Sequence, residues 1–216
     1  MNQLLLILAL FQSPDTGYHK FNTADTTCYV SPFSVYSKAW NDPKYAVCNT
    51  AASADYMNDT EKQVIYMLNL IRMNPVLFCE TVLKQYPTSN EEREHYTSSG
   101  YFSSLVNTLT QMEPVNILYP DSICFVSAHC HALQSGLTGY EGHDRTKECQ
   151  RLQHLRGECC DYGFNDPLDI VIDLLIDEDV PSLGHREICL SLRYDKIGVS
   201  IQPHTTYRYN TVMDFY

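Results

Sequence analysis

The chain has 216 residues, of which 44% are hydrophobic and 19% are charged, and its formal net charge is −11. This composition is typical of a globular protein and excludes a disordered one, and the length suits one domain with an extension. With only 15 Lys and Arg residues, the chain is a poor partner for a phosphate backbone or an anionic membrane. We therefore exclude nucleic acid as a ligand.

The N-terminal residues have the pattern of a secretory leader. An uncharged apolar run extends from Leu4 to Phe11, which is too short to cross a bilayer but has the length of a signal-peptide core. We therefore predict a leader over residues 1–20, no transmembrane span, and a protein that is secreted or held at the cell surface or in the periplasm. The run has no Lys or Arg before it, and an ordinary apolar helix or a misplaced start is the alternative.

Residues 21–58 show no sustained hydrophobic period and are rich in Asn, Asp, Ser, Thr and Tyr. This pattern predicts an irregular extension that lies across the surface of the protein, tied down by Cys28 and Cys48. The domain itself is predicted over residues 59–216.

The nine cysteines favour disulfides in an exported protein, because cytosolic thiols are kept reduced. No C-x-x-C pair is present, so the spacing does not indicate a zinc ribbon or a thioredoxin-type site. Cys79 and Cys124 lie in apolar helical runs and are predicted core residues. The disulfide candidates are Cys149, Cys159, Cys160 and Cys189. A bond from Cys149 to Cys159 or Cys160 would close a short loop, and the odd count leaves at least one thiol free.

The hydrophobic period predicts the first helices of the domain. A capping box at Thr60 and Gln63 begins a helix whose apolar residues recur at i, i+3, i+4 and i+7. This helix ends at Asn74, which with Pro75 suits the N-cap and first position of a second helix that runs to about Tyr86, before Pro87. A third helix is predicted over residues 101–112.

A fourth helix is predicted from about residue 120 to Gly136, with an apolar stripe toward the core. The stripe residues are Ile123, Val126, Cys130 and Leu133, and the small Ala128 and Ala132 allow close packing. A fifth helix covers residues 167–176, and apolar residues then alternate over 197–201 and 207–215, which predicts a β-hairpin. Several helices followed by a hairpin predict an α+β fold, with helices packed on a small antiparallel sheet.

Several short motifs then follow one another along the chain. They are Leu68-Asn69-Leu70-Ile71-Arg72-x-Asn74-Pro75, Gly142-His143, Gly157-Glu158, Gly184-His185-Arg186-x-Ile188-x-Leu190, Lys196-Ile197-Gly198-Val199 and Met213-Asp214-Phe215-Tyr216. In this order they resemble the motifs of the CAP superfamily (SCP-like domains), which includes cysteine-rich secretory and pathogenesis-related proteins, and in particular its bacterial secreted branch. The resemblance implies a three-layer α-β-α sandwich with a small antiparallel sheet.

The resemblance also implies a cleft with two histidines and two acidic residues, in which the histidines can hold a divalent cation. The matching positions are His143, Glu158, Asp177 and His185. For the second acid, Glu178 and Asp173 are alternatives. The chain departs from the family pattern at Cys159, where the family has Asn, and at Leu174, where it has Trp.

Two neutral imidazoles suit Zn²⁺ or a similar ion, so His143 and His185 are the predicted metal ligands. We predict a binding role, with an unidentified extracellular ligand or protein as partner. One alternative is a metal-dependent hydrolase that uses Glu158 as its base, and another is a structural or interaction module without a cleft function. Asp144 and Arg145, beside His143, are expected in a surface ion pair, and the alternative is that they orient His143.

Overall fold

A computed structural model describes residues 29–88 and 91–216, so the predicted leader and Cys28 lie outside the described residues. The α-helices are α1 (Asp59–Met73), α2 (Pro75–Thr81), α3 (Gly100–Gln111), α4 (Ser122–Thr138), α5 (Lys147–Leu152), α6 (Pro167–Ile176) and α7 (Gly184–Cys189). The strands are β1 (Tyr119–Pro120), β2 (Gly157–Tyr162), β3 (Lys196–His204) and β4 (Arg208–Phe215). Short 3-10 helices cover Pro32–Val35, Lys38–Asn41, Pro43–Cys48, Leu83–Thr88 and Glu91–Ser98.

The four strands form one sheet in the order β1-β3-β4-β2. Strands β3 and β4 are the predicted hairpin, and β2 pairs with β4 in the antiparallel direction, with Glu158 opposite Asp214. The two-residue strand β1 runs parallel to β3, so the sheet is mixed. The prediction of a wholly antiparallel sheet is wrong at this strand. Strand β2 is at an edge of the sheet, which leaves its outer side available to line a cleft.

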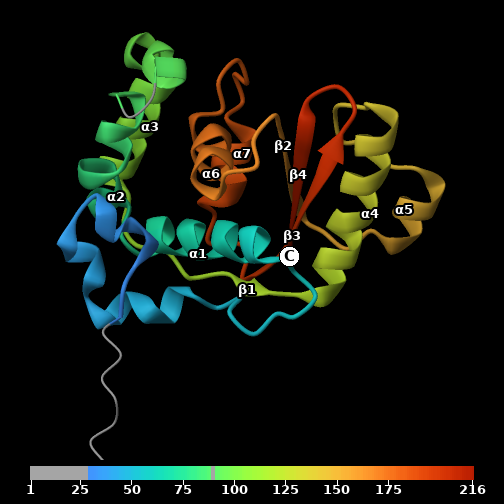
Figure 1. The fold of residues 1–216 in the computed structure, drawn as a ribbon, viewed down its shortest axis with the longest axis horizontal. Coiled ribbons are helices and arrows are strands. Elements are labelled where there is room, and N and C mark those ends of the chain that lie inside the picture. The colour runs from blue at the N-terminus through green and yellow to red at the C-terminus, as the bar shows by residue number, and fades with distance from the viewer. Residues whose placement is uncertain (1–28, 89–90) are drawn as a thin grey trace, which may run out of the picture.

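Helices cover both faces of this sheet, as the three-layer α-β-α prediction requires (Figure 1). Helix α4 packs on β3 and β4 from one side, while α1 packs on β3 and α6 and α7 pack on β2 from the other. The α+β fold class is therefore confirmed. Within the described residues, none of the helices combines the length and the apolar character that a bilayer crossing requires.

Helix α4 turns a different face to the sheet than its apolar stripe predicts. Ile123, Val126 and Leu133 are all more than a third exposed. The close packing predicted at Ala128 and Ala132 is confirmed, and the buried face carries small and polar residues: Cys124, Ser127, Ala128, His131, Ala132, Ser135 and Gly136. Small residues are needed there because the helix lies so close to the sheet that a side chain on Gly198 would clash with the backbone at Phe125.

The first helix begins and ends close to its predicted position, with one correction at its cap. The capping box of α1 joins Asn58 and Glu61, not Thr60 and Gln63. Glu61 also accepts the Ile201 backbone N–H of β3 at 2.9 Å, so the cap ties α1 to the sheet. Asn74 caps α2 and Pro75 is its first residue, as predicted, but α2 ends at Thr81 rather than near Tyr86, and a 3-10 helix follows over Leu83–Thr88.

The segment before α1 is not a surface extension over its described part. Phe33, Trp40 and Tyr45 are fully or almost fully buried and belong to the same hydrophobic core as the sheet and helices. The Trp40 indole donates to the Thr81 hydroxyl at 2.9 Å. Cys48 is a buried free thiol, so the predicted tie through Cys48 is wrong. Aromatic packing, rather than a disulfide, holds this segment to the domain.

Candidate functional site

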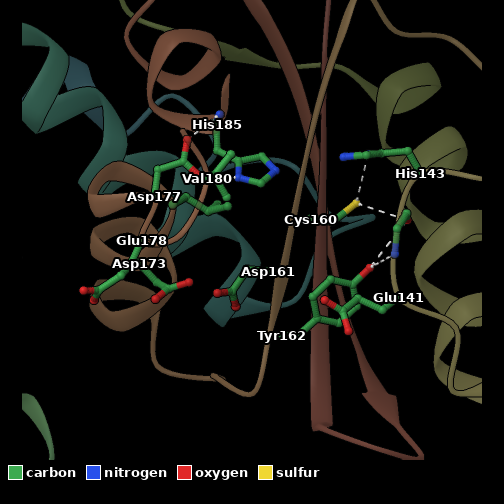
Figure 2. Close-up of a pocket in the computed structure, with 12 residues that line it drawn as sticks. Glu141, His143, Cys160, Asp161, Tyr162, Asp173, Asp177, Glu178, Val180 and His185 are labelled. Carbon is green, nitrogen blue, oxygen red and sulfur yellow. Dashed lines mark hydrogen bonds and ion pairs between the residues drawn. The ribbon is translucent and has the colours of Figure 1, made fainter. Parts of the chain in front are cut away.

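A cavity of about 300 Å³ opens beside the edge strand β2, between α6 and α7 on one side and the loop after α4 on the other (Figure 2). Its titratable lining includes two histidines and five acids: His143, His185, Glu141, Asp161, Asp173, Asp177 and Glu178. No lysine or arginine of the described chain lines it. The cavity therefore has an acidic lining, and a cation is the ligand that this lining favours.

Strand β2 sends alternate side chains to the two sides of this cavity, because successive residues of a strand point to opposite faces. Glu158 and Cys160 point toward His143, which lies in the loop after α4. Cys159 and Asp161 point the other way, toward α7 and α6. One short strand thus contributes to both halves of the site.

His143 is held by Glu158, which is held in turn by Arg145. The His143 Nδ1 lies 2.8 Å from Glu158 Oε1, and the second Glu158 oxygen contacts the Arg145 guanidinium. Arg145 also donates to both oxygens of Asp214 at 2.9 Å. The expected surface ion pair of Arg145 is therefore wrong, since this side chain is only 3% exposed and pairs with two buried carboxylates.

His143 and Glu158 shift each other's pKa. Burial alone would raise the pKa of Glu158, but the hydrogen bond from His143 and the charge of Arg145 outweigh it and lower the pKa to about 2. The same hydrogen bond raises the pKa of His143, whose side chain is 57% exposed. Glu158 is therefore a carboxylate at neutral pH, with both oxygens already engaged.

His185 is held by Asp177 in a matching way. Asp177 ends α6 in the left-handed conformation, with φ 56° and ψ 47°, and Asp179 and Leu183 also have positive φ in the turn that leads into α7. This turn brings His185 back, so that its Nδ1 lies 2.8 Å from Asp177 Oδ1 and its backbone N–H donates to Oδ2 at 3.0 Å. Asp177, rather than Asp173 or Glu178, is thus the acid that contacts the second histidine.

The two imidazoles face each other across the cavity. Their ring centroids are 6.1 Å apart, and Figure 2 shows ring nitrogens of His143 and His185 directed toward one another. Because each Nδ1 is engaged by a carboxylate, the Nε2 atoms are the ones left to bind a ligand. The structure thus brings the four predicted site residues into one cleft, with Glu158 behind His143 rather than in the lining.

The disulfide of the described chain joins Cys130 to Cys149, with their Cα atoms 5.4 Å apart, and it links α5 to α4. The predicted bond from Cys149 to Cys159 or Cys160 is therefore wrong. Cys160 points instead toward His143, with its Sγ 3.7 Å from Nδ1. Cys159 and Cys189 are free thiols with Sγ atoms 3.9 Å apart. Cys79 and Cys124 are buried free thiols, as predicted for core residues.

A second group of possible metal ligands lies behind the cavity but is a poor cation site. Ligand atoms of His131, Glu158 and Cys160 all lie within 4.8 Å of one another. The Arg145 guanidinium already contacts Glu158, and its positive charge repels a cation there. Burial also raises the pKa of the Cys160 thiol and so keeps it protonated. We assign no metal to this group.

Sequence reasoning did not identify Asp161 and Asp214 as residues of this region and misjudged Arg145. The alternation along residues 157–162 is the one signal that could have placed Asp161 opposite α6. The pairing of Asp214 with Arg145 has no such local signal, because the two residues are 69 positions apart.

Comparison with known proteins gives little further information. No protein-family model matches the sequence, and no curated protein matches it. Among solved structures, an outer surface protein from Borrelia burgdorferi is similar to this chain, with 21% sequence identity and a TM-score of 0.38. The likeness covers 59% of this chain and 92% of that one.

Proposed function

We propose that this chain carries a CAP-superfamily domain that binds a divalent cation of the Zn²⁺ type between His143 and His185 and acts by binding, at or outside the cell surface. The observation that carries the proposal is the pair of imidazoles facing each other, with ring centroids 6.1 Å apart. Two Zn–N bonds of about 2 Å, added to the two ring radii, span at most about 6 Å, so the two rings lie at the limit of reach of one shared ion. Water or a ligand group would complete the coordination.

Glu158 and Asp177 have a positioning role in this proposal. Each accepts the Nδ1–H of one histidine, which fixes the tautomer whose Nε2 carries the lone pair. Metal-binding histidines in proteins commonly have such a carboxylate partner. The order of these four residues along the chain also agrees with the CAP resemblance.

Binding fits this site better than hydrolysis. A general base works best with a pKa near the operating pH, whereas the pKa of Glu158 is about 2. Its two oxygens are also engaged by His143 and Arg145, and its side chain is buried. The hydrolase alternative therefore lacks the base that it requires.

The Cys130–Cys149 disulfide supports an extracellular or periplasmic location, since disulfides persist in oxidising compartments. An extracellular ligand or protein would then meet the bound cation through the open side of the cleft, where His143 is exposed.

Zinc titration by calorimetry on the full chain tests the proposal. We expect one equivalent of Zn²⁺ to bind to the wild type and to the control His129→Ala, whose ring lies on α4 and contacts Ser200. The His143→Ala/His185→Ala variant should fold and bind none. A folded wild type that binds no Zn²⁺ would contradict the proposal and leave the four residues as a structural hydrogen-bond network.

A further inference from the structure

Asp161 is a buried acidic residue that takes no part in the proposed Zn²⁺ site. It lies on β2, lines the cavity and is 2% exposed. Neither of its carboxylate oxygens receives a hydrogen bond within the described chain. A buried carboxylate in this state is strongly destabilising unless a proton or a cation satisfies it.

Asp161 faces Asp173 of α6, and Figure 2 shows the two carboxyl groups turned toward one another inside the cavity. They are close enough to share a proton, and burial raises the pKa of both. The Tyr96 hydroxyl donates to Asp173 at 3.3 Å. Over residues 29–88 and 91–216, neither acid has an ion pair with a lysine, arginine or histidine.

The neighbouring acids of α6 show what this pair lacks. Asp169 and Asp177 lie one helical turn before and after Asp173 and share its face. Asp169 pairs with the Arg93 guanidinium, and Asp177 pairs with His185. Within the described residues, Asp173, between them, has a hydroxyl and the carboxyl group of Asp161 but no ion pair. Unlike its neighbours on α6, the pair therefore has no positively charged partner in the described chain and is satisfied by a proton or by a bound cation.

We propose that Asp161 and Asp173 bind a hard divalent cation, of the Mg²⁺ or Ca²⁺ class, in the part of the cavity away from His143. Such ions take oxygen ligands, and Mg²⁺ in particular is commonly held by one or two carboxylates with water completing the shell. A cavity of about 300 Å³ has room for several waters, each of which occupies about 30 Å³ in the liquid.

This site is independent of Zn²⁺ binding by the histidines. Imidazole nitrogens suit Zn²⁺, whereas carboxylate and water oxygens suit Mg²⁺ and Ca²⁺. If His143 and His185 bind nothing, the two carboxylates still lack a positive partner. The two sites are therefore tested with different ions and different variants.

The test is calorimetric titration of the full chain with Mg²⁺ and, separately, with Ca²⁺. We expect one equivalent of at least one of these ions to bind to the wild type and to His143→Ala/His185→Ala. In Asp161→Asn/Asp173→Asn we expect binding to weaken by about tenfold or more, since both ligands lose their charge. The control Glu113→Gln/Glu148→Gln removes the same charge from two exposed positions and should bind as the wild type does.

If Asp161→Asn/Asp173→Asn folds poorly, the Tm of a single variant, measured with and without the cation, still tests the proposal. The single change Asp161→Asn preserves the size of the side chain and should abolish the rise in Tm that the cation produces in the wild type. Absence of Mg²⁺ and Ca²⁺ binding to the folded wild type at millimolar concentration would overturn the proposal and leave the pair sharing a proton. Equal affinity in Asp161→Asn/Asp173→Asn, or loss of binding in His143→Ala/His185→Ala, would also overturn it.

Discussion

Arg145 is the residue on which the His143 half of the cleft depends. Its guanidinium contacts Glu158 and Asp214 and donates to the Ser127 carbonyl oxygen at 2.8 Å, all in a buried position. The sequence places Arg145 two residues after His143, but its charge partners come from two strands, 13 and 69 positions further along the chain. The local sequence pattern could therefore identify His143 and Glu158 as motif positions. It could not show that the Arg145 guanidinium connects Glu158 to Asp214.

Removal of the positively charged Arg145 side chain should destabilise the fold strongly. Arg145→Ala leaves two buried carboxylates without their partner, and we expect a loss of about 3–5 kcal/mol in the free energy of unfolding. Urea denaturation measures this loss. The control Arg151→Ala changes an exposed arginine and should shift the free energy by no more than about 0.5 kcal/mol. Similar small losses in both variants would show that Arg145 is not the centre of this network.

The hydrogen bond between His143 and Glu158 should be visible in the titration of the metal-free chain. Because Glu158 raises the pKa of His143, this pairing stabilises the fold below the ordinary histidine value of 6.5, and its contribution is lost as the pH rises through the raised pKa. NMR titration of the ring protons should give a lower pKa for His143 in Glu158→Gln than in the wild type. An unchanged pKa would mean that Glu158 does not hold this imidazole in solution.

At the scale of elements, the hydrophobic period predicts where helices and the hairpin lie better than which face they bury. The 167–176 helix has its predicted bounds, because Pro167 follows a good N-cap in Asp166 and the apolar run is continuous. Helix α4 lies where the period predicts but is rotated about its axis. The face that α4 buries depends on how closely its backbone approaches β3 at Gly198. Because Gly198 belongs to the strand, the hydrophobic period of the helix does not show this contact.

The close approach of α4 and β3 gives a direct prediction. Gly198→Ala would force its new methyl group against the backbone at Phe125, and we expect a loss of about 1–3 kcal/mol in the free energy of unfolding. Gly100→Ala is the matched control, since a methyl group there meets nothing within 4 Å at the start of α3. That control should be neutral or stabilising by up to about 1 kcal/mol. Equal effects of the two changes in urea denaturation would rule out the tight interface.

At the scale of the whole molecule, a large hydrophobic cluster extends from Phe33 to Phe215, and a smaller one joins α4 to β2 and β4. The sheet, which contributes to both clusters, fixes the two halves of the cleft relative to each other. The half with His185 is carried by α6 and α7, and the half with His143 is carried by the loop after α4, on opposite sides of β2. The net charge of −11 and the acidic lining both favour cations at this place. Sequence motifs indicated the four cleft residues, whereas the carboxylate pair of Asp161 and Asp173 required the fold.

X-ray absorption at the zinc edge of the full chain, loaded with one equivalent of Zn²⁺, tests the central claim most directly. Binding between His143 and His185 predicts a first shell of nitrogen and oxygen atoms at about 2.0–2.1 Å, with the outer-shell pattern of imidazole. The His143→Ala/His185→Ala variant should lose this signal. A sulfur shell at about 2.3 Å would instead place the ion at a thiolate such as Cys160, and would contradict the account.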